Sequence, residues 1–494
     1  MNLETLAARG ELLQSELGHE WYRTGAGLKP EADFQAIYAR HADLQEDAAL
    51  AAVRDAGVPA LLEWIVDLRV GRRVAAFAER QLAWEQRTVL TVGDRQIPYL
   101  RAGIDLQNAP DRAFRLALDR ARLDAGADGL IEIRRDQLAA ERDVVCALAG
   151  AHDYVEAVAR LSGMDLGRLA DQALALLADT RELYADALAR VTRRRIGVAP
   201  DALLRADAAW AFRADAYDAA FPRAELVATA IRQMGELGLD AMEGGRVRVD
   251  AEERPGKQPR AFCVPVRVPH EVYLVVRPSG GHADYRTFWH ELGHAMHFAA
   301  VDADRPFHER WLGDNSVTEA FAMLWDHLTL DGEWLGRYTE LGQGGRRGQN
   351  GQVRDLLFEL AVSELHLLRR YAAKLGYEIA LHRSDYGEAM ADEYAERLTE
   401  ATGFRYSGED YLTDVDSGFY AGRYLRAWQL EAALARMLVE GFGTDWFRNP
   451  RAGVVVRDLM RRGQADPAER LAADLGLAAL SFAPVLERLA PQLA

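Results

Sequence analysis

The segment from Asp284 to His297 contains the residue types of a hydrolytic metal centre at the spacing of a helix. His290 and His294 are four residues apart, so on a helix both imidazoles lie on one face, about 6 Å apart, and can reach one zinc ion at ~2.0–2.1 Å. Glu291 directly follows the first histidine and can face a water molecule on the metal, where a general base is needed. The pattern His-Glu-x-x-His therefore predicts metal-assisted hydrolysis.

The helix that carries this pattern is expected to be buried. The histidines at 290, 294 and 297 share one stripe, and apolar side chains cover most of the remaining surface: Phe288, Trp289, Leu292, Met296 and Phe298. Several histidines on one face of a buried helix need polar partners. Without a metal, the pattern would be a histidine pair bonded to backbone or water.

A third ligand is expected from another element, because a hydrolytic zinc usually has three protein ligands and one open position. Glu319 lies in a predicted helix, Ser316–Leu328, that is apolar on more than one face, where an unpaired carboxylate is costly. Asp326 shares the face of Glu319 and could orient a ligand histidine. The alternative is that Glu319 lies in the first turn only because the helix dipole favours it. The predicted site holds one Zn²⁺ per chain on His290, His294 and Glu319.

A fourth protein ligand would close the site and make the metal structural. His297 and His327 are the candidates, but His297 lies about one helical turn beyond His294, and we expect it to hydrogen-bond nearby instead. The metzincin pattern, which needs a Gly and a third His at fixed offsets after His294, is absent.

The elements that must position these residues are mostly helices, since Ala, Leu, Arg and Glu dominate and apolar residues recur at three- and four-residue spacing. Strands are expected in a hairpin at 88–100 and in a β region at 246–277 that ends just before the metal helix. The predicted fold class is mainly α, with one small antiparallel sheet next to the zinc helix. The glycine-rich segment 342–351 predicts a loop, either a flexible connection or a lid.

Composition limits the function classes. The chain has 494 residues, 49% of them hydrophobic and 28% charged, which is typical of a globular protein. Its net charge of −16 argues against nucleic acid or an anionic membrane as a partner. Two cysteines exclude a disulfide scaffold and a Cys-based zinc module. With no secretory pattern at the N-terminus and no long apolar run, we expect no membrane span and a cytoplasmic location.

The region around the expected ligands resembles the thimet oligopeptidase and oligoendopeptidase F family of zinc peptidases (peptidase family M3). The family signature is His-Glu-Phe-Gly-His-Ala-Leu-His, and residues 290–297 read His-Glu-Leu-Gly-His-Ala-Met-His. The family's third ligand is a Glu on the next helix, and the position of Glu319 fits that spacing. Upstream, 256–263 (Gly-Lys-Gln-Pro-Arg-Ala-Phe-Cys) is similar to the family's Gly-Lys-Arg-x-Gly-Ala-Tyr/Phe-Cys segment. The resemblance covers about residues 200–440 and is only compositional in the first 190.

This resemblance implies a helical body with two lobes around a deep channel that admits short unstructured peptides. It implies a helical N-terminal lobe at 1–195 and a catalytic region of the gluzincin type at 196–494. We expect a monomer or homodimer, and we expect an extended substrate to pair with the edge of the strand at 271–277.

The sequence departs from the family downstream, where the family carries a His and tyrosines that hydrogen-bond the tetrahedral intermediate. Tyr420 and Tyr424 match the Phe-Tyr-x-x-x-Tyr framework of the oligoendopeptidase F branch, but the usual His is missing. Arg426 lies where a catalytic Tyr is expected, and it could stabilise the oxyanion or bind a substrate carboxylate. Alternatively, the tyrosines are packed helix residues and the arginines are solvated.

The predicted function is therefore a zinc-dependent metalloendopeptidase acting on short peptides, with Glu291 as general base. One alternative is a zinc carboxypeptidase, in which Arg423 or Arg426 fixes the substrate's C-terminal carboxylate. The other is a peptide-binding protein that retains the metal site but turns over little substrate.

Overall fold

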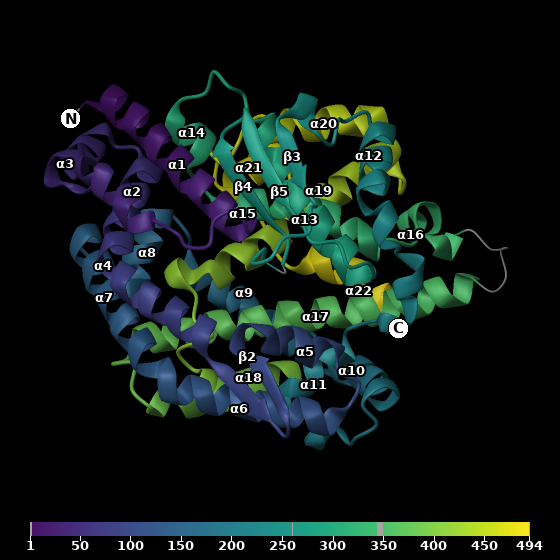
Figure 1. The fold of residues 1–494 in the computed structure, drawn as a ribbon. Helices are drawn as coiled ribbons and strands as arrows, with labels where there is room; N and C mark the ends of the chain where they lie inside the picture. Colours follow the sequence, from purple (N-terminus) through teal and green to yellow (C-terminus); the bar gives the residue numbers. More distant parts are fainter. Residues whose placement is uncertain (1, 259, 343–348, 494) are drawn as a thin grey trace. The chain divides into compact units, whose positions relative to one another are not determined.

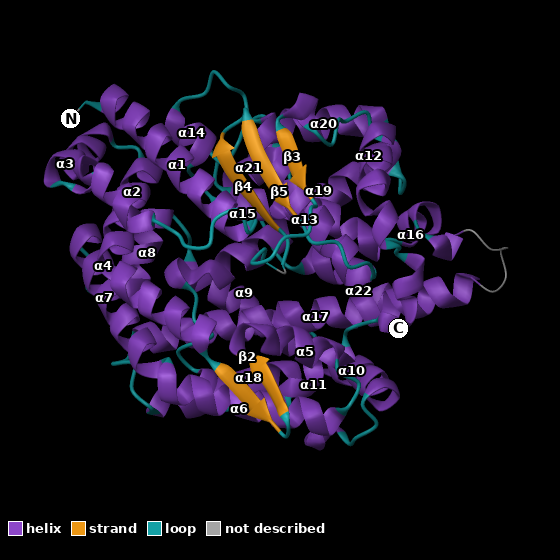
Figure 2. Ribbon diagram, in the orientation of Figure 1, coloured by secondary structure: helices purple, strands orange, loops and turns teal. Residues whose placement is uncertain are grey.

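The computed structural model describes residues 2–258, 260–342 and 349–493. Helices predominate in these ranges, and strands form two small sheets (Figures 1 and 2). None of the helices in these ranges has both the length and the apolar character needed to cross a bilayer. The expected loop at 342–351 falls largely on residues 343–348, which lie outside the described ranges.

The chain divides into two compact units, each built from separate segments. The first unit comprises Met1–Ile65, Asp215–Leu357 and Arg426–Gln492, and the second comprises Val66–Ala214, Phe358–Leu425 and Leu493–Ala494. The N-terminal lobe at 1–195 and the catalytic region at 196–494 that the resemblance implies stay predictions. Four boundaries fall inside helices, where no linker composition marks a division: α4 (Pro59–Arg87), α17 (Gln349–His382), α19 (Tyr420–Phe442) and α22 (Ala483–Leu493). The expected channel between two lobes stays a prediction.

The first unit contains the expected metal ligands. Its sheet and α13 lie next to each other in Figure 1. Besides parts of α4, α17 and α19, its helices are α1 (Leu3–Gly25), α2 (Phe34–Arg40), α3 (Asp47–Ala56), α12 (Leu226–Glu236), α13 (His282–Ala300), α14 (Phe307–Trp311), α15 (Asn315–Asp326), α16 (Gly332–Tyr338), α20 (Pro450–Met460), α21 (Ala468–Asp474) and α22 (Ala483–Leu493).

The second unit contains the hairpin expected at 88–100. Strands β1 (Val89–Val92) and β2 (Arg95–Pro98) pair antiparallel around Gly93, whose φ of +62° favours glycine in a tight turn. The apolar side of the hairpin joins a small core with α5 and α6. The other helices of this unit are α5 (Ala102–Asn108), α6 (Arg112–Gly129), α7 (Ile131–Ala149), α8 (Tyr154–Ser162), α9 (Leu166–Asp179), α10 (Arg181–Arg195), α11 (Arg205–Ala211) and α18 (Ala389–Thr402).

The sheet of the first unit is mixed, whereas we expected an antiparallel one. Its strand order is β3 (Val247–Asp250), β5 (Glu271–Val275), β4 (Phe262–Arg267). After β3 the chain crosses to the far edge to form β4 and then returns to the centre as β5. Strand β5 therefore runs antiparallel to β4 and parallel to β3. Because β5 is paired on both sides, it cannot be the edge for an extended peptide, and that expectation was wrong.

Helix α13 is buried almost all round, as its apolar pattern predicts. It begins after Gly281, and Asp284 in its first turn accepts hydrogen bonds from the backbone N–H groups of Ser279 and Gly280. It packs against β4, β5 and α15. Helix α15 is capped by Asp314, which accepts from the N–H of Ser316, and every later residue of α15 is buried. Glu319 and Asp326 on α15 therefore face protein rather than bulk water.

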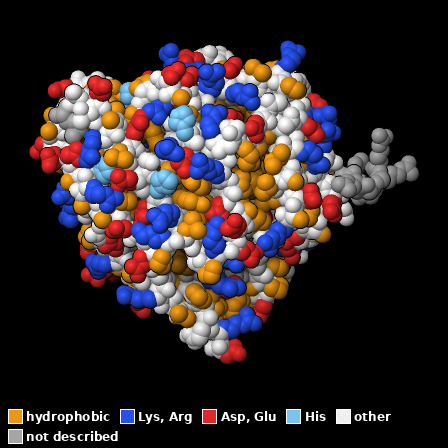
Figure 3. Space-filling view, turned by 45° about the horizontal axis from the view of Figure 1, so that its top comes forward, with side chains coloured by type: hydrophobic (Ala, Val, Ile, Leu, Met, Phe, Trp, Pro, Cys, Tyr) orange, Lys and Arg blue, Asp and Glu red, His pale blue; other side chains and the backbone are white. Residues whose placement is uncertain are grey.

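Acidic and basic side chains are interspersed over the face of the molecule in Figure 3, with hydrophobic groups between them. On this face the basic side chains do not gather into one continuous patch.

Candidate metal centre and active site

Helices α13 and α15 bring together the three ligands expected from the sequence. The Nε2 atoms of His290 and His294 lie 3.3 Å and 3.5 Å from Oε2 of Glu319. One ligand atom from each residue lies within 4.8 Å of the others, so the group could hold a metal ion. Two imidazoles and one carboxylate are a donor set that suits zinc.

The other ring nitrogen of each histidine is held by α15. His290 Nδ1 lies 2.8 Å from Asp326 Oδ2, and His294 Nδ1 lies 2.9 Å from Thr318 Oγ1. Because both Nδ1 atoms are engaged, both Nε2 atoms are directed at the common point beside Glu319. Asp326 makes the contact with a ligand histidine that its place on the helix predicts. Sequence reasoning missed Thr318, since a threonine inside a helix carries no signal of its own.

The electrostatics of this group favour a cation. Burial alone would raise the pKa of the Glu319 carboxyl, but the charge of His294 and hydrogen bonds from both histidines outweigh it and hold that pKa well below its usual range. Burial likewise opposes a charge on His290, yet Asp326 and Glu319 hold its pKa well above the usual value. A buried carboxylate that stays ionised between two imidazoles is a plausible place for a divalent ion.

Glu291 lies on the same helix but outside the converging group. Burial raises the pKa of its carboxyl, although His294, His290 and a hydrogen bond from the backbone of Cys263 act in the opposite direction. Cys263 belongs to β4, so Glu291 lies beside this edge strand. A carboxylate with a raised pKa is a better match for proton transfer near neutral pH than an ordinary glutamate.

Comparison with known structures identifies the fold. A candidate oligoendopeptidase F from Bacillus anthracis has a TM-score of 0.62 at 14% identity and covers 88% of this chain and 75% of its own. A second candidate oligoendopeptidase F has a TM-score of 0.63 at 15% identity, covering 99% and 84% of the two chains. A candidate peptidase from Chlamydophila abortus has a TM-score of 0.65 at 12% identity, and the match covers 99% of this chain and 89% of the peptidase chain. The chain has the oligoendopeptidase F fold.

Sequence comparison alone does not find this relationship. No protein-family model matches the chain, and no curated protein matches it. The identities of 12–15% explain why, since the oligoendopeptidase F fold is retained here while little of the sequence is shared.

In this oligoendopeptidase F fold, two further histidines were candidates for a fourth ligand. His297 is fully buried against the Phe321 ring, 4.7 Å between centroids, and burial lowers its pKa to about 3. His327 Nδ1 lies 2.9 Å from Glu431 Oε2 instead. Within the described residues, neither belongs to the group that could hold the metal.

Arg426 is held by partners inside the first unit. Its Nη1 donates to Asp314 (3.0 Å) and Ser316 (2.8 Å), its Nε donates to Glu469 (2.9 Å), and its Nη2 pairs with Asp314 (2.7 Å) and with Glu469. These contacts engage all five N–H donors of the guanidinium. They favour support of the start of α15 over the oxyanion or substrate-carboxylate role expected from the sequence.

Tyr420 and Tyr424 lie in the second unit, at the start of α19, with their rings 5.2 Å apart. Tyr371 on α17, which sequence reasoning did not single out, packs 5.2 Å from Tyr424. Arg423 belongs to the same unit and is buried. The roles expected of Tyr420, Tyr424 and Arg423 stay predictions.

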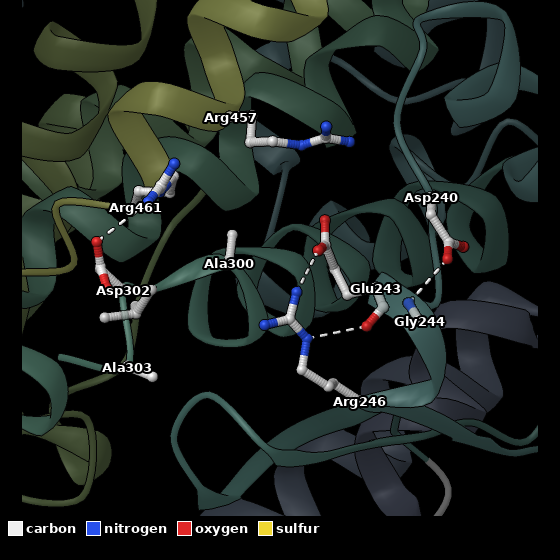
Figure 4. A pocket seen from close by; sticks show the side chains of 10 residues that line it. Asp240, Glu243, Gly244, Arg246, Ala300, Asp302, Ala303, Arg457 and Arg461 are labelled. Atoms are coloured by element: carbon white, nitrogen blue, oxygen red, sulfur yellow. Dashed lines mark hydrogen bonds and ion pairs between the residues drawn. The ribbon is translucent and has the colours of Figure 1, made fainter.

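A cavity of about 640 Å³ opens at the C-terminal end of α13 (Figure 4). Its charged lining residues are partly paired with one another, Arg246 with Glu243 and Arg461 with Asp302. None of the expected site residues lines it. The cavity is therefore separate from the candidate metal centre.

The close approach of α13 and α15 depends on Gly293, which lies between the two ligand histidines. An added Cβ would lie 2.6 Å from Ala322 Cα and 2.7 Å from Trp325 Cδ1, so the helices would have to move apart. We expect Gly293→Ala to lower the free energy of unfolding by about 1–3 kcal/mol and to weaken metal binding, because Glu319 moves away from the histidines. Urea unfolding and zinc titration measure the two effects.

The control for this prediction is Gly441→Ala on α19, where an added Cβ has no neighbour within 4 Å. This variant should keep both stability and zinc binding. If Gly293→Ala bound zinc as tightly as the wild type, the tight helix contact would not be what sets the ligand geometry.

Proposed function

We propose that the chain is a zinc-dependent peptidase that hydrolyses short unstructured peptides. The observation that carries the proposal is the convergence of His290, His294 and Glu319 with a half-buried Glu291 alongside. The likeness to structures described as oligoendopeptidases supports peptides as the substrate class.

The three ligands would hold one zinc ion, which when bound lowers the pKa of a water molecule towards ~7 and polarises the scissile carbonyl. Glu291 accepts the proton of the attacking water and passes it to the leaving amine. Asp326 and Thr318 keep the histidine rings oriented through their Nδ1 atoms. The raised pKa of Glu291 suits a group that must both take and return a proton.

Substrate binding would use an edge of the sheet and the tyrosines. Strand β4 is an edge strand and its Cys263 backbone bonds Glu291, so we propose that an extended peptide pairs beside β4 rather than β5. Tyr420 and Tyr424 are proposed to donate hydrogen bonds to the tetrahedral intermediate.

The test is the metal content of the protein purified without added metal. Wild type should contain about one zinc per chain, and Glu319→Ala should contain little, because its removal leaves only two ligands. The control is Glu333→Ala, which removes an exposed carboxylate at the start of α16 and should keep the zinc. A wild type that takes up no zinc even after dialysis against it would refute the proposal.

A further inference from the structure

The support of His290 continues beyond Asp326 through a line of buried charged groups. His327, the next residue, has Nε2 3.5 Å from Asp326 Oδ1 and Nδ1 2.9 Å from Glu431 Oε2. Glu431 lies on α19 and is 1% exposed. His327 therefore lies between two carboxylates, and in its protonated form it forms an ion pair with each, the closer one with Glu431.

Arg488 on α22 fixes the far end of this line. Its Nη1 and Nη2 donate to the two oxygens of Glu431 at 2.7 Å and 2.9 Å, and its Nη2 lies 3.1 Å from His327 Nδ1. A two-point contact between planar groups fixes the orientation of the carboxylate as well as its distance. Burial would raise the pKa of Glu431, but Arg488 and His327 lower it to about 2, so the carboxylate is ionised at neutral pH.

We propose that Glu431 and Arg488 are positioning residues for the metal centre, acting on His290 through His327 and Asp326. We call Arg488, Glu431, His327 and Asp326 the support chain. The inference rests on the proposed binding of metal by His290. It assigns a function to two residues that are far from the ligands in the sequence and that carry no recognisable motif.

The geometry around Asp326 explains why the support chain would matter for metal binding. One Asp326 oxygen holds His290 Nδ1 at 2.8 Å, and the other lies 3.5 Å from both His327 Nε2 and Arg286 Nε. If His327 loses its contact with Glu431, one of the two cationic groups beside Asp326 Oδ1 is no longer held in place. The His290 ring, which Asp326 orients, then has more freedom to turn away from Glu319.

The two helices of the support chain also offer a matched control. Arg436 on α19 and Glu487 on α22 form an ion pair of 3.3 Å between these same helices, but both side chains are exposed, by 42% and 63%. Breaking this pair perturbs the contact of α19 with α22 without touching the support chain. An exposed pair contributes little to stability.

The test measures zinc affinity of the full-length protein by competition with a chelator. Substitution of a residue that orients a ligand typically weakens metal affinity by 10–100-fold, so for Glu431→Gln, two residues beyond Asp326 in the support chain, we expect a loss of about 5-fold or more. Arg488→Lys keeps the charge but loses the two-point contact with Glu431, so it should also weaken the affinity for zinc. Arg436→Ala should leave it unchanged within about 2-fold.

A second readout separates positioning from general stabilisation. The absorption spectrum of the Co²⁺-substituted protein reports ligand geometry, and it should change in Glu431→Gln and Arg488→Lys but not in Arg436→Ala. If both support-chain variants are folded, and bind zinc with wild-type affinity and an unchanged Co²⁺ spectrum, the inference is wrong. If Glu431→Gln does not fold, Arg488→Lys alone decides between the two outcomes. A wild type that binds no zinc would instead refute the proposed function.

Discussion

Glu291→Gln should lower kcat/KM for a short peptide by about 10²–10⁴-fold while zinc stays bound. Glutamine has almost the shape of glutamate but cannot take the proton of the attacking water, so only the general-base contribution is lost. His290, His294 and Glu319 are unchanged, so the metal content should remain about one per chain. A quenched fluorescent peptide measures turnover, and atomic absorption measures zinc.

The matched control is Glu333→Gln, a change of the same chemistry at an exposed position, which should keep both turnover and zinc. Turnover by Glu291→Gln equal to the wild type would show that another group is the base. A wild type with zinc but no turnover of any peptide would favour the binding-only alternative. Amidation of the substrate's C-terminus tests the carboxypeptidase alternative, because an endopeptidase should still cleave the amidated peptide.

Arg426→Ala should lower the free energy of unfolding by about 3–5 kcal/mol. The side chain is 4% exposed, and its removal leaves the buried Asp314 carboxylate without its cation. Asp314 also caps α15, so the effect should reach the helix that carries Glu319. Urea unfolding of the metal-free protein measures the loss.

Arg436→Ala, at an exposed position on the same helix, is the control and should change stability by no more than about 0.5 kcal/mol. The oxyanion role expected from the sequence makes the opposite prediction for Arg426→Ala. In that case stability would be retained and kcat would fall. That outcome would show that Arg426 acts in catalysis.

The metal site could be predicted because its information is local. His290, Glu291 and His294 fall within one helical turn, and the burial of Glu319 follows from the apolar pattern around it. The hairpin at 88–100 could be predicted for the same reason, because a Gly-Asp turn between two short apolar runs specifies it.

What the sequence could not reveal depends on long-range contacts. Arg488 and Glu431 are in contact although they are 57 residues apart in the sequence, and His327 and Arg488 are 161 residues apart. The direction of β3 relative to β5 depends on where the chain places β4, which no local pattern encodes. The partners of Arg426 could not be predicted for the same reason, because Asp314 and Glu469 are distant from it in sequence.

The division of the first unit among three segments has a consequence for biosynthesis. Its packing requires both Met1–Ile65 and Arg426–Gln492, so the first of these segments cannot complete its packing until the second has been synthesised. Ser316 of α15 gains its contact with Arg426, and His327 just after α15 gains its contact with Glu431, only at that stage. A nascent chain released before residue 426 would therefore lack the partners of Asp314 and His327, which lie at the two ends of α15.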